Sequence, residues 1–283
     1  MSFLAKWKYR HVFFTSLYMG GWMILLYVLW RLGWPGDVQG CVSSQSCFCE
    51  FVDLNTFWGQ PFSSPTNFAY VVSGFAIILY YDYVRPSSAN AGPSKDFDHL
   101  TPFSFLYALL TITIGIGSLY MHVSWRNWAG TFDVYAMNLY IVFLLLYLVT
   151  HAFHWSWGRF LVLYIPIEVV MFVIYQWGIV EDANLVFGVL TAAVIILEIV
   201  WQVVSRFHQT LARRDWRLLF VSIAFFLGAF GIWLLQKSEI WPCDPDSLLQ
   251  PHGLWHIFTA AATFTIFLYL KSEYLLESPT QKG

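Results

Sequence analysis

The stretch PHGLWHIFTAAATFTIFLYLK, residues 251–271, indicates the kind of fold to expect. It is mostly apolar and carries no acidic or basic residue other than histidine before Lys271, and about 20 apolar residues are enough for a helix to cross a bilayer. Two histidines, His252 and His256, nevertheless lie one helical turn apart at its start, where imidazoles are costly to bury. The stretch predicts a transmembrane helix with a polar first turn that needs an explanation.

The composition of the whole chain predicts more helices of this kind. Of 283 residues, 58% are hydrophobic and only 11% are charged, whereas soluble domains carry about 25% charged residues. The net charge is −2 and no long basic run occurs, which argues against nucleic acid as a partner. Eight runs are long and apolar enough to span a membrane: 11–33, 65–84, 102–122, 131–152, 160–178, 184–204, 217–236 and 251–271. Because the connections are short, we predict one all-α, polytopic membrane bundle.

The first run and the basic residues predict how the chain crosses the membrane. HVFFTSLYMGGWMILLYVLW, residues 11–30, is longer than a signal-peptide core and lacks a small-residue cleavage site, so we expect a retained anchor helix. With the N-terminus in the cytoplasm, twelve Lys and Arg residues fall on the inner side and three, Arg31, Arg126 and Lys237, on the outer side. Eight helices would return the C-terminus to the cytoplasm.

This orientation puts all four cysteines on the non-cytoplasmic side, where an oxidising compartment permits disulfides. They are Cys41, Cys47, Cys49 and Cys243. Two bridges are possible, with three connectivities, and unpaired thiols are the alternative.

Three of the eight histidines, His122, His252 and His256, also fall on the outer side. Three histidines match the protein ligands of a catalytic zinc, which keeps a fourth position open for water. His252 and His256, at i and i+4, share one helix face and can reach a single metal. No Glu lies between them, so a catalytic base must come from elsewhere. Such a pair is also typical of a structural role at the membrane interface.

Two further segments place polar residues at the same depth. In GIGSLYMHVSW, residues 115–125, Ser118 and His122 lie one turn apart at the outer end of their run. In GTFDVYAMN, residues 130–138, Asp133 lies inside the next run, and a carboxylate in a membrane helix is costly and usually functional. Together with the histidine pair, these residues indicate either a metal site or a polar network between helices.

Four other polar residues of the runs have a structural interpretation. Glu168 and Glu198 lie in apolar runs away from the outer histidines, and we expect each to pair with another helix or to stay protonated. His151 and His154 lie at the inner end of a run, where we interpret them as interface anchors rather than as a metal-binding pair.

Several segments occur together in an order and spacing that resemble a known family. They are the pair Cys49–Glu50, QPFSSPTNFAYVVSGF (60–75), GIGSLYMH (115–122), FDVYAM (132–137) and HGLWHIFT (252–259). Over about residues 49–271, the chain resembles the alkaline ceramidases of the CREST superfamily of membrane hydrolases. The resemblance implies a seven-helix core, to which this chain adds one N-terminal helix. It also implies a zinc ion that activates a water to cleave ceramide into sphingosine and a fatty acid.

Within this resemblance, individual residues receive roles. His122, His252 and His256 match the zinc ligands. Asp133 matches the acid that binds or deprotonates the zinc water, and Ser118 matches the serine that completes the polar cluster. The expected partner is therefore a lipid substrate, ceramide or a related lipid, at a site facing the non-cytoplasmic side, and no protein partner is predicted.

The resemblance also implies one disulfide and a division of the chain. Cys49 and Cys243 match a family bridge between the N-terminal segment and the loop before the last helix, which leaves Cys41 and Cys47 for a second, local bridge. The expected parts are an N-terminal anchor helix (1–40), a disulfide-tied outer loop (41–64), a seven-helix catalytic core (65–272) and a cytoplasmic tail (273–283).

The chain departs from the family at a calcium site. Alkaline ceramidases bind calcium before the first core helix, and Glu50 matches one of the ligands. At the other aligned positions Cys47, Val52 and Gln60 replace oxygen-rich ligands. Because calcium takes six to eight oxygens, we expect this Ca²⁺ site to be lost or rebuilt.

Two alternatives to a zinc-dependent lipid amidase remain from the sequence. Other members of the superfamily are thought to act on lipid esters, so the bond could differ while the metal stays. The chain could also be a membrane receptor in which zinc fixes the helices and nothing turns over. Asp133→Asn separates enzyme from receptor, because only an enzyme would lose a reaction.

Overall fold

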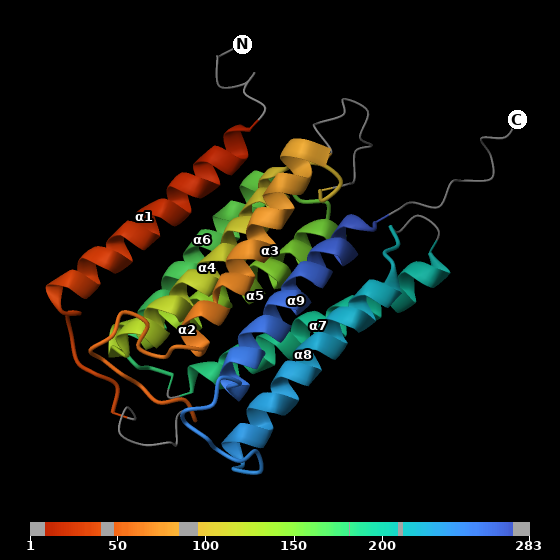
Figure 1. The fold of residues 1–283 in the computed structure, drawn as a ribbon. Coiled ribbons are helices and arrows are strands. Elements are labelled where there is room, and N and C mark those ends of the chain that lie inside the picture. Colours follow the sequence, from red (N-terminus) through yellow and green to blue (C-terminus); the bar gives the residue numbers. More distant parts are fainter. Residues whose placement is uncertain (1–8, 41–47, 85–95, 181, 209–211, 274–283) are drawn as a thin grey trace, which may run out of the picture.

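The computed structural model describes residues 9–40, 48–84, 96–180, 182–208 and 212–273, which form a bundle of helices (Figure 1). Within these ranges no β-strand forms, and only two isolated bridges occur. Seven helices of the described part are long and apolar enough to cross a membrane: α1 (Arg10–Leu32), α4 (Pro102–Ser124), α5 (Asn127–Ala152), α6 (Trp157–Gln176), α7 (Ala183–Phe207), α8 (Trp216–Lys237) and α9 (Pro251–Lys271). The predicted all-α, polytopic fold is confirmed.

The second predicted run, 65–84, is divided into pieces. It comprises α2 (Ser63–Thr66), α3 (Phe68–Leu79) and a π-helical turn (Tyr80–Val84). Between α2 and α3, the Asn67 amide donates Nδ2 hydrogen bonds to the carbonyls of Ser63 (3.0 Å) and Ser64 (3.3 Å). This competition of a side chain with the backbone interrupts the helix. As a result, the Ser63 carbonyl is open to side chains rather than to a backbone N–H, and this matters at the site described below.

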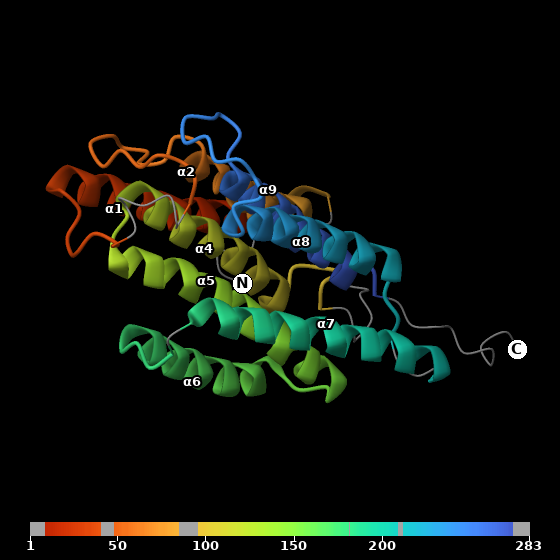
Figure 2. The ribbon, with the colours of Figure 1, turned by 90° about the horizontal axis from the view of Figure 1, so that it is seen from below.

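Helix α4 lies at the centre of the bundle, and nearly all of its residues from Tyr107 to Ser124 are buried. It packs between α3 and α5, while α9 packs against α3 and α8. Figure 2 shows α5 between α4 and α6, so α6 lies at one edge. A side chain at Gly115 would collide with the Asn67 carbonyl oxygen, 2.7 Å from its Cβ. Glycine at this position therefore lets α4 approach the interrupted helix closely.

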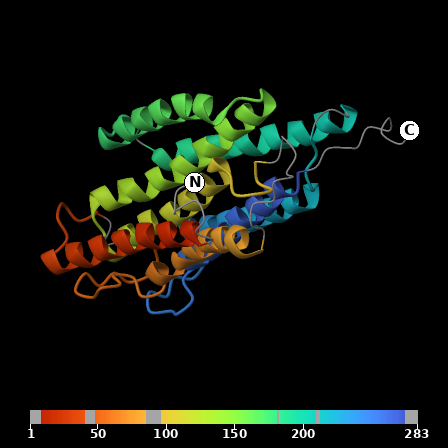
Figure 3. The same ribbon diagram turned by 90° about the horizontal axis from the view of Figure 1, so that it is seen from above.

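Helix α1 packs on the face made by α3 and α4, beside α3 and away from α6 and α7 (Figure 3). At its start, Asp82 accepts hydrogen bonds from the backbone N–H of Val12 (3.1 Å) and lies 2.8 Å from Nδ1 of His11. Further along, the Tyr120 hydroxyl donates to the carbonyl of Trp22 (2.6 Å). Specific polar contacts therefore join α1 to the bundle, in addition to apolar packing.

A buried ionic cluster lies where α7 ends and α8 begins. Arg214, only 2% exposed, reaches Glu198 on α7 (Nη1–Oε1 2.7 Å) and Glu273 after α9 (Nε–Oε2 2.9 Å). Nε2 of His151 lies 3.2 Å from Oε2 of Glu273. Burial lowers the pKa of Arg214, but the nearby carboxylates outweigh it and hold the pKa above its ordinary value. Glu198 thus pairs across the bundle as expected, whereas the side-chain carboxyl of Glu168 has no hydrogen-bond partner among the described residues.

Candidate metal centre

The three outer histidines meet between α4 and α9. His122 lies in the last turn of α4, and His252 and His256 lie in the first two turns of α9. One ring nitrogen from each lies within 4.8 Å of the others, and all three side chains are buried. The Nε2 atoms of His122 and His252 are 3.1 Å apart. Two nitrogens bound to one tetrahedral zinc at about 2.0–2.1 Å are separated by roughly 3.3 Å, so the spacing fits a shared metal.

The outer nitrogens of two rings face hydrogen-bond acceptors. Nδ1 of His122 lies 2.5 Å from Oε1 of Gln60. Nδ1 of His256 lies 3.2 Å from the Ser63 carbonyl and 3.0 Å from the Thr66 hydroxyl, whose own hydrogen is donated to the same carbonyl. Each Nδ1 must therefore carry the hydrogen, which leaves each Nε2 with a lone pair turned toward the centre. Nδ1 of His252 has no partner among the described residues. A buried group of imidazoles with inward lone pairs suits a cation, and zinc in particular.

Ser118 and Asp133 lie beside these histidines. Ser118 lies one turn before His122 on α4, and its Oγ is 3.3 Å from Nε2 of His256. Asp133, in the second turn of α5, lies near Ser118 and lines the same cavity. Helices α4 and α5 can come close here because residue 117 is a glycine. A Cβ at this position would lie only 3.1 Å from the Phe132 carbonyl oxygen. The structure thus brings all five residues singled out in the sequence into one cluster.

The family model of the ceramidases matches residues 42–282 of the chain. The chain belongs to the ceramidase family. Membership implies a membrane hydrolase that acts on ceramide, and it covers the five clustered residues. The comparison with curated proteins gives no match. Helix α1 and the residues up to 41 lie outside the matched region.

In this ceramidase-family chain, Gln60 lies beside the histidine cluster, a position that the sequence did not reveal. The sequence suggested only a missing calcium ligand, but Gln60 is fully buried beside the histidines. Its Nε2 donates to the Glu50 carbonyl (3.1 Å), so its Oε1 must be the atom that accepts from His122. No periodic pattern connects residue 60 with residue 122, and the one available signal was its place at the start of the QPFSSPTN motif.

Glu50, the other expected calcium ligand, caps the start of α2. Its two carboxylate oxygens accept hydrogen bonds from the backbone N–H groups of Phe62 (2.5 Å) and Ser63 (2.9 Å). A carboxylate at a helix N-terminus satisfies donors that would otherwise be unpaired. Val52 offers no side-chain oxygen, and Cys47 lies outside the described residues. In this ceramidase-family chain, Glu50 therefore has hydrogen-bond partners without a cation.

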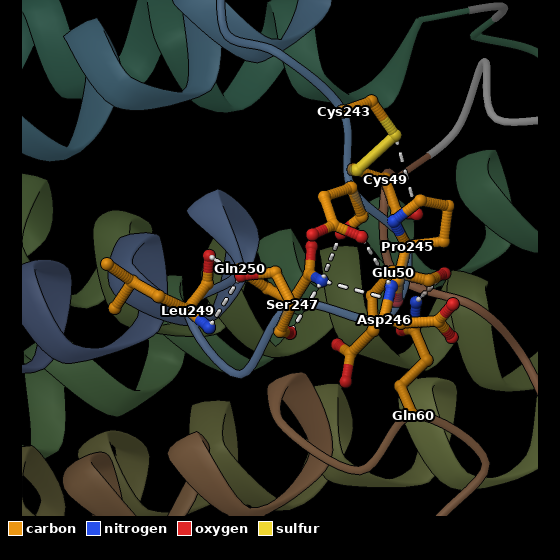
Figure 4. Close-up of a disulfide and its surroundings, with 10 residues drawn as sticks. Cys49, Glu50, Gln60, Cys243, Pro245, Asp246, Ser247, Leu249 and Gln250 are labelled. Atoms are coloured by element: carbon orange, nitrogen blue, oxygen red, sulfur yellow. Dashed lines mark hydrogen bonds between the residues drawn. A yellow bond between two sulfur atoms is a disulfide. The ribbon is translucent and has the colours of Figure 1, made fainter.

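A disulfide between Cys49 and Cys243, the pair that the resemblance implied, ties these parts together. Figure 4 shows Glu50 next to the loop that follows Cys243, with Gln60 nearby. Within this loop, Nε2 of Gln250 donates to the carbonyls of Asp244 (3.0 Å) and Ser247 (2.9 Å). The loop ends at Gln250, two residues before His252, so its anchoring helps to position the start of α9. Cys41 and Cys47 lie outside the described residues.

A cavity of about 600 Å³ opens beside the cluster. Ser118, Asp133, His252 and His256 line it. Much of the remaining wall is apolar. Six residues are shared with a second, smaller cavity of about 100 Å³: Tyr70, Ile114, Met137, Phe187, Phe226 and Trp255. The second cavity continues between α7 and α9 as far as Glu198. The space is therefore polar near the histidines and apolar beyond them, as ligand sites for lipids require.

Proposed function

We propose that this ceramidase-family chain hydrolyses the amide bond of ceramide or a closely related lipid, using zinc held by His122, His252 and His256. The observation that carries the proposal is the convergence of three buried imidazoles beside a carboxylate, at the polar end of an apolar cavity. Catalytic zinc takes three protein ligands of this kind. When bound, zinc would polarise the amide carbonyl and lower the pKa of a water molecule.

Asp133 would act as the general base and later as the general acid. Its carboxylate lies in the cavity wall beside Ser118, where it can take a proton from the attacking water. Amide hydrolysis then needs a proton on the leaving nitrogen, and Asp133 can return the same one. This role supplies the base that the HGLWH pair itself lacks.

Ser118 would first orient the Asp133 carboxylate and then stabilise the amide carbonyl oxygen of the substrate. Its hydroxyl can donate to the Asp133 carboxylate before substrate arrives, and it can rotate to donate elsewhere. A hydroxyl directed at the carbonyl oxygen stabilises the negative charge that develops there in the transition state. Ser118 therefore supports both the base and the oxyanion.

The apolar cavities would hold the hydrocarbon of the lipid. Along α9, the wall runs from His256 to Thr263, seven residues or about 10 Å of helix, and on to Ile266. A chain lying here would present its amide at the histidines and bury its carbons between α7 and α9. Burial of apolar surface is the main source of affinity for such a chain.

The topology belongs to the same proposal. The distribution of basic residues supports cytoplasmic termini and a metal site at the non-cytoplasmic end, with the Arg214 cluster at the inner end. We propose that residues 1–40 anchor the chain, that 41–64 form an outer loop, and that 65–272 form the catalytic core. Residues 273–283 would be a cytoplasmic tail.

The test is zinc content and fatty-acid release measured on the same detergent-purified samples, for wild type and His256→Ala. We expect about one zinc per chain in wild type, and loss of zinc and turnover together in the variant. His154→Ala is the matched control, because this exposed histidine lies at the other end of the bundle. Ester lipids are assayed in parallel: release from esters alone would assign a lipid esterase, and zinc without any turnover a zinc-stabilised receptor.

A further inference from the structure

The segment that follows α1 folds onto the turn between α4 and α5. Gly33, with φ +91°, ends the helix in the left-handed conformation that glycine favours. After it, the carbonyl of Pro35 accepts from Nε1 of Trp128 (2.8 Å), and the carbonyl of Gly36 accepts from Nη1 of Arg126 (2.8 Å). Side chains of the α4–α5 turn thus hold this segment against the metal-site end of the bundle.

The backbone of Gln39 is fixed by an antiparallel bridge. Val38 forms the bridge with Arg126. The backbone N–H of Gln39 donates to the backbone carbonyl of Trp125 (2.9 Å), and the backbone N–H of Asn127 donates to the backbone carbonyl of Asp37 (3.0 Å). Trp125 lies three residues after His122 and directly follows α4. The position of Gln39 is therefore fixed relative to the metal centre, although Gln39 lies outside the region that matches the family.

The Gln39 side chain lines the same cavity as Asp133, Ser118 and His252. Its amide lies over Gly130, where any Cβ would overlap Nε2. Gly130 lies three residues before Asp133 on α5, so the amide lies about one helical turn from the carboxylate. The polar contact of this amide within the described residues is long, 3.4 Å from Nε2 to the Arg126 carbonyl.

Other polar side chains lie around the same cavity. Asp182 and Asn184 at the start of α7, and Lys237 at the end of α8, also line it, and Asp182 and Lys237 are exposed. They come from helix ends, whereas Ser118, His252 and His256 are buried. The cavity thus has a polar rim outside its reactive cluster. Among these rim residues, the Gln39 amide lies on Gly130, one helical turn before Asp133 on α5.

We propose that Gln39 binds the polar head of the lipid whose amide lies at the cluster, so that the N-terminal segment forms part of the substrate site. A primary amide donates and accepts hydrogen bonds, and so does a hydroxyl, which makes hydroxyl groups of the lipid head the matching chemistry. This proposal rests on the proposed function. It gives the segment after α1 a role in substrate recognition in addition to anchoring.

Gln39→Ala and Gln39→Leu test it with ceramide and with a ceramide lacking its primary hydroxyl. A net hydrogen bond is worth roughly 3- to 10-fold in affinity. We therefore expect KM for ceramide to rise by about that factor, with kcat changed less than twofold and with little change for the deoxy lipid. Equal losses on both lipids, or no loss on either, would overturn the proposal.

Gly130→Ala tests the same position without touching Gln39 itself. A Cβ there displaces the Gln39 amide, while alanine is a better helix former than glycine, so thermal stability should not fall. We expect the same rise in KM. Gln176→Ala is the matched control, since this exposed glutamine at the end of α6 does not line the cavity and should leave KM unchanged.

A binding measurement separates this proposal from the proposed function. In the Asp133→Asn background, ceramide binding is followed by the rise in thermal midpoint of the detergent-solubilised chain, with and without the added substitution Gln39→Ala. A smaller rise in thermal midpoint for the chain that carries Gln39→Ala supports the role of Gln39. This holds even if wild type turns over no lipid, because that result would contradict only the proposed hydrolysis. An identical rise in both chains refutes the role of Gln39 whatever the activity.

Discussion

Gln60 and His122 are 62 positions apart in sequence, yet the Gln60 amide oxygen accepts a hydrogen bond from Nδ1 of His122 at 2.5 Å. The other end of the same amide donates to the Glu50 carbonyl, and Glu50 in turn caps α2. One loop therefore controls the orientation of a ring on α4. Where a histidine binds a metal, removing the group that orients its ring typically costs about 10- to 100-fold in metal affinity.

Gln60→Leu should lower zinc affinity by about 10- to 100-fold, because Nδ1 of His122 loses its acceptor and the ring loses its fixed tautomer. Gln60→Glu keeps an acceptor oxygen and should retain most of the affinity. Competition with a chelator, measured on the purified chain, gives the affinity directly. Gln176→Leu serves as the control. Equal zinc affinity for the Leu and Glu variants would contradict the orienting role.

Gly59→Ala should destabilise the chain and weaken zinc binding together. Gly59 has φ +60°, and a Cβ there would lie 2.9 Å from the Val123 carbonyl oxygen and closer still to that of His122. Strain of this kind costs about 1–3 kcal/mol and would push Gln60 away from His122. The thermal midpoint and the zinc content report the two effects. Gly20→Ala, in open space on α1, should change neither.

Helical periodicity explains why much of this site could be predicted. His252 and His256 on one helix, and Ser118 and His122 on another, must share a face because the spacing is four residues. Apolar run lengths predicted the spans, and seven helices in the described part of the chain are long enough to cross a membrane. The basic residues, counted over the whole chain, predicted Asp133 and the histidines on one side of the membrane. The predictions of shared helix faces and of spans use only residues close together in the chain.

The remaining contacts of the site join segments that are far apart in the chain, and no periodic pattern in the sequence predicts them. Glu50, Gln60 and Gln39 lie in irregular segments, whose path depends on the packing of the helices around them. The interruption of the second predicted run has a similar origin, since Asn67 takes carbonyls that a helix would use itself. Polar residue types were visible in the sequence, but their partners were not.

Asp133→Asn should leave zinc content and thermal stability close to wild type and lower kcat by about 10²- to 10⁴-fold. Asparagine keeps the shape of the side chain and can still bond to Ser118, but it cannot accept a proton from water. The measurement is zinc per chain beside single-turnover release of fatty acid. Loss of zinc in this variant would instead make Asp133 part of the metal-binding set.

Replacing both disulfide cysteines, Cys49→Ser with Cys243→Ser, should lower stability by about 2–4 kcal/mol. The bridge closes a large loop, with a sequence separation of 194 residues, and it holds the segment that precedes His252. Zinc should therefore leave the double variant faster than wild type. Thermal midpoint and zinc off-rate are measured without reductant. Unchanged zinc release would limit the disulfide to a role in stability.

Asp96→Asn should raise stability more at high pH than at low pH. Burial raises the pKa of Asp96 above 3.8, although the Arg214 cation acts in the opposite direction. The folded chain thus holds this proton more tightly than the unfolded chain, so stability is lost as pH rises from about the ordinary pKa through the raised one. Asparagine has no proton to lose, and the Asp96 carbonyl that accepts from Thr101 is kept. Thermal midpoints between about pH 4 and pH 8 should show a difference from wild type that grows and then levels off. A difference that shrinks as pH rises would mean that the attraction of Arg214 exceeds the cost of burial.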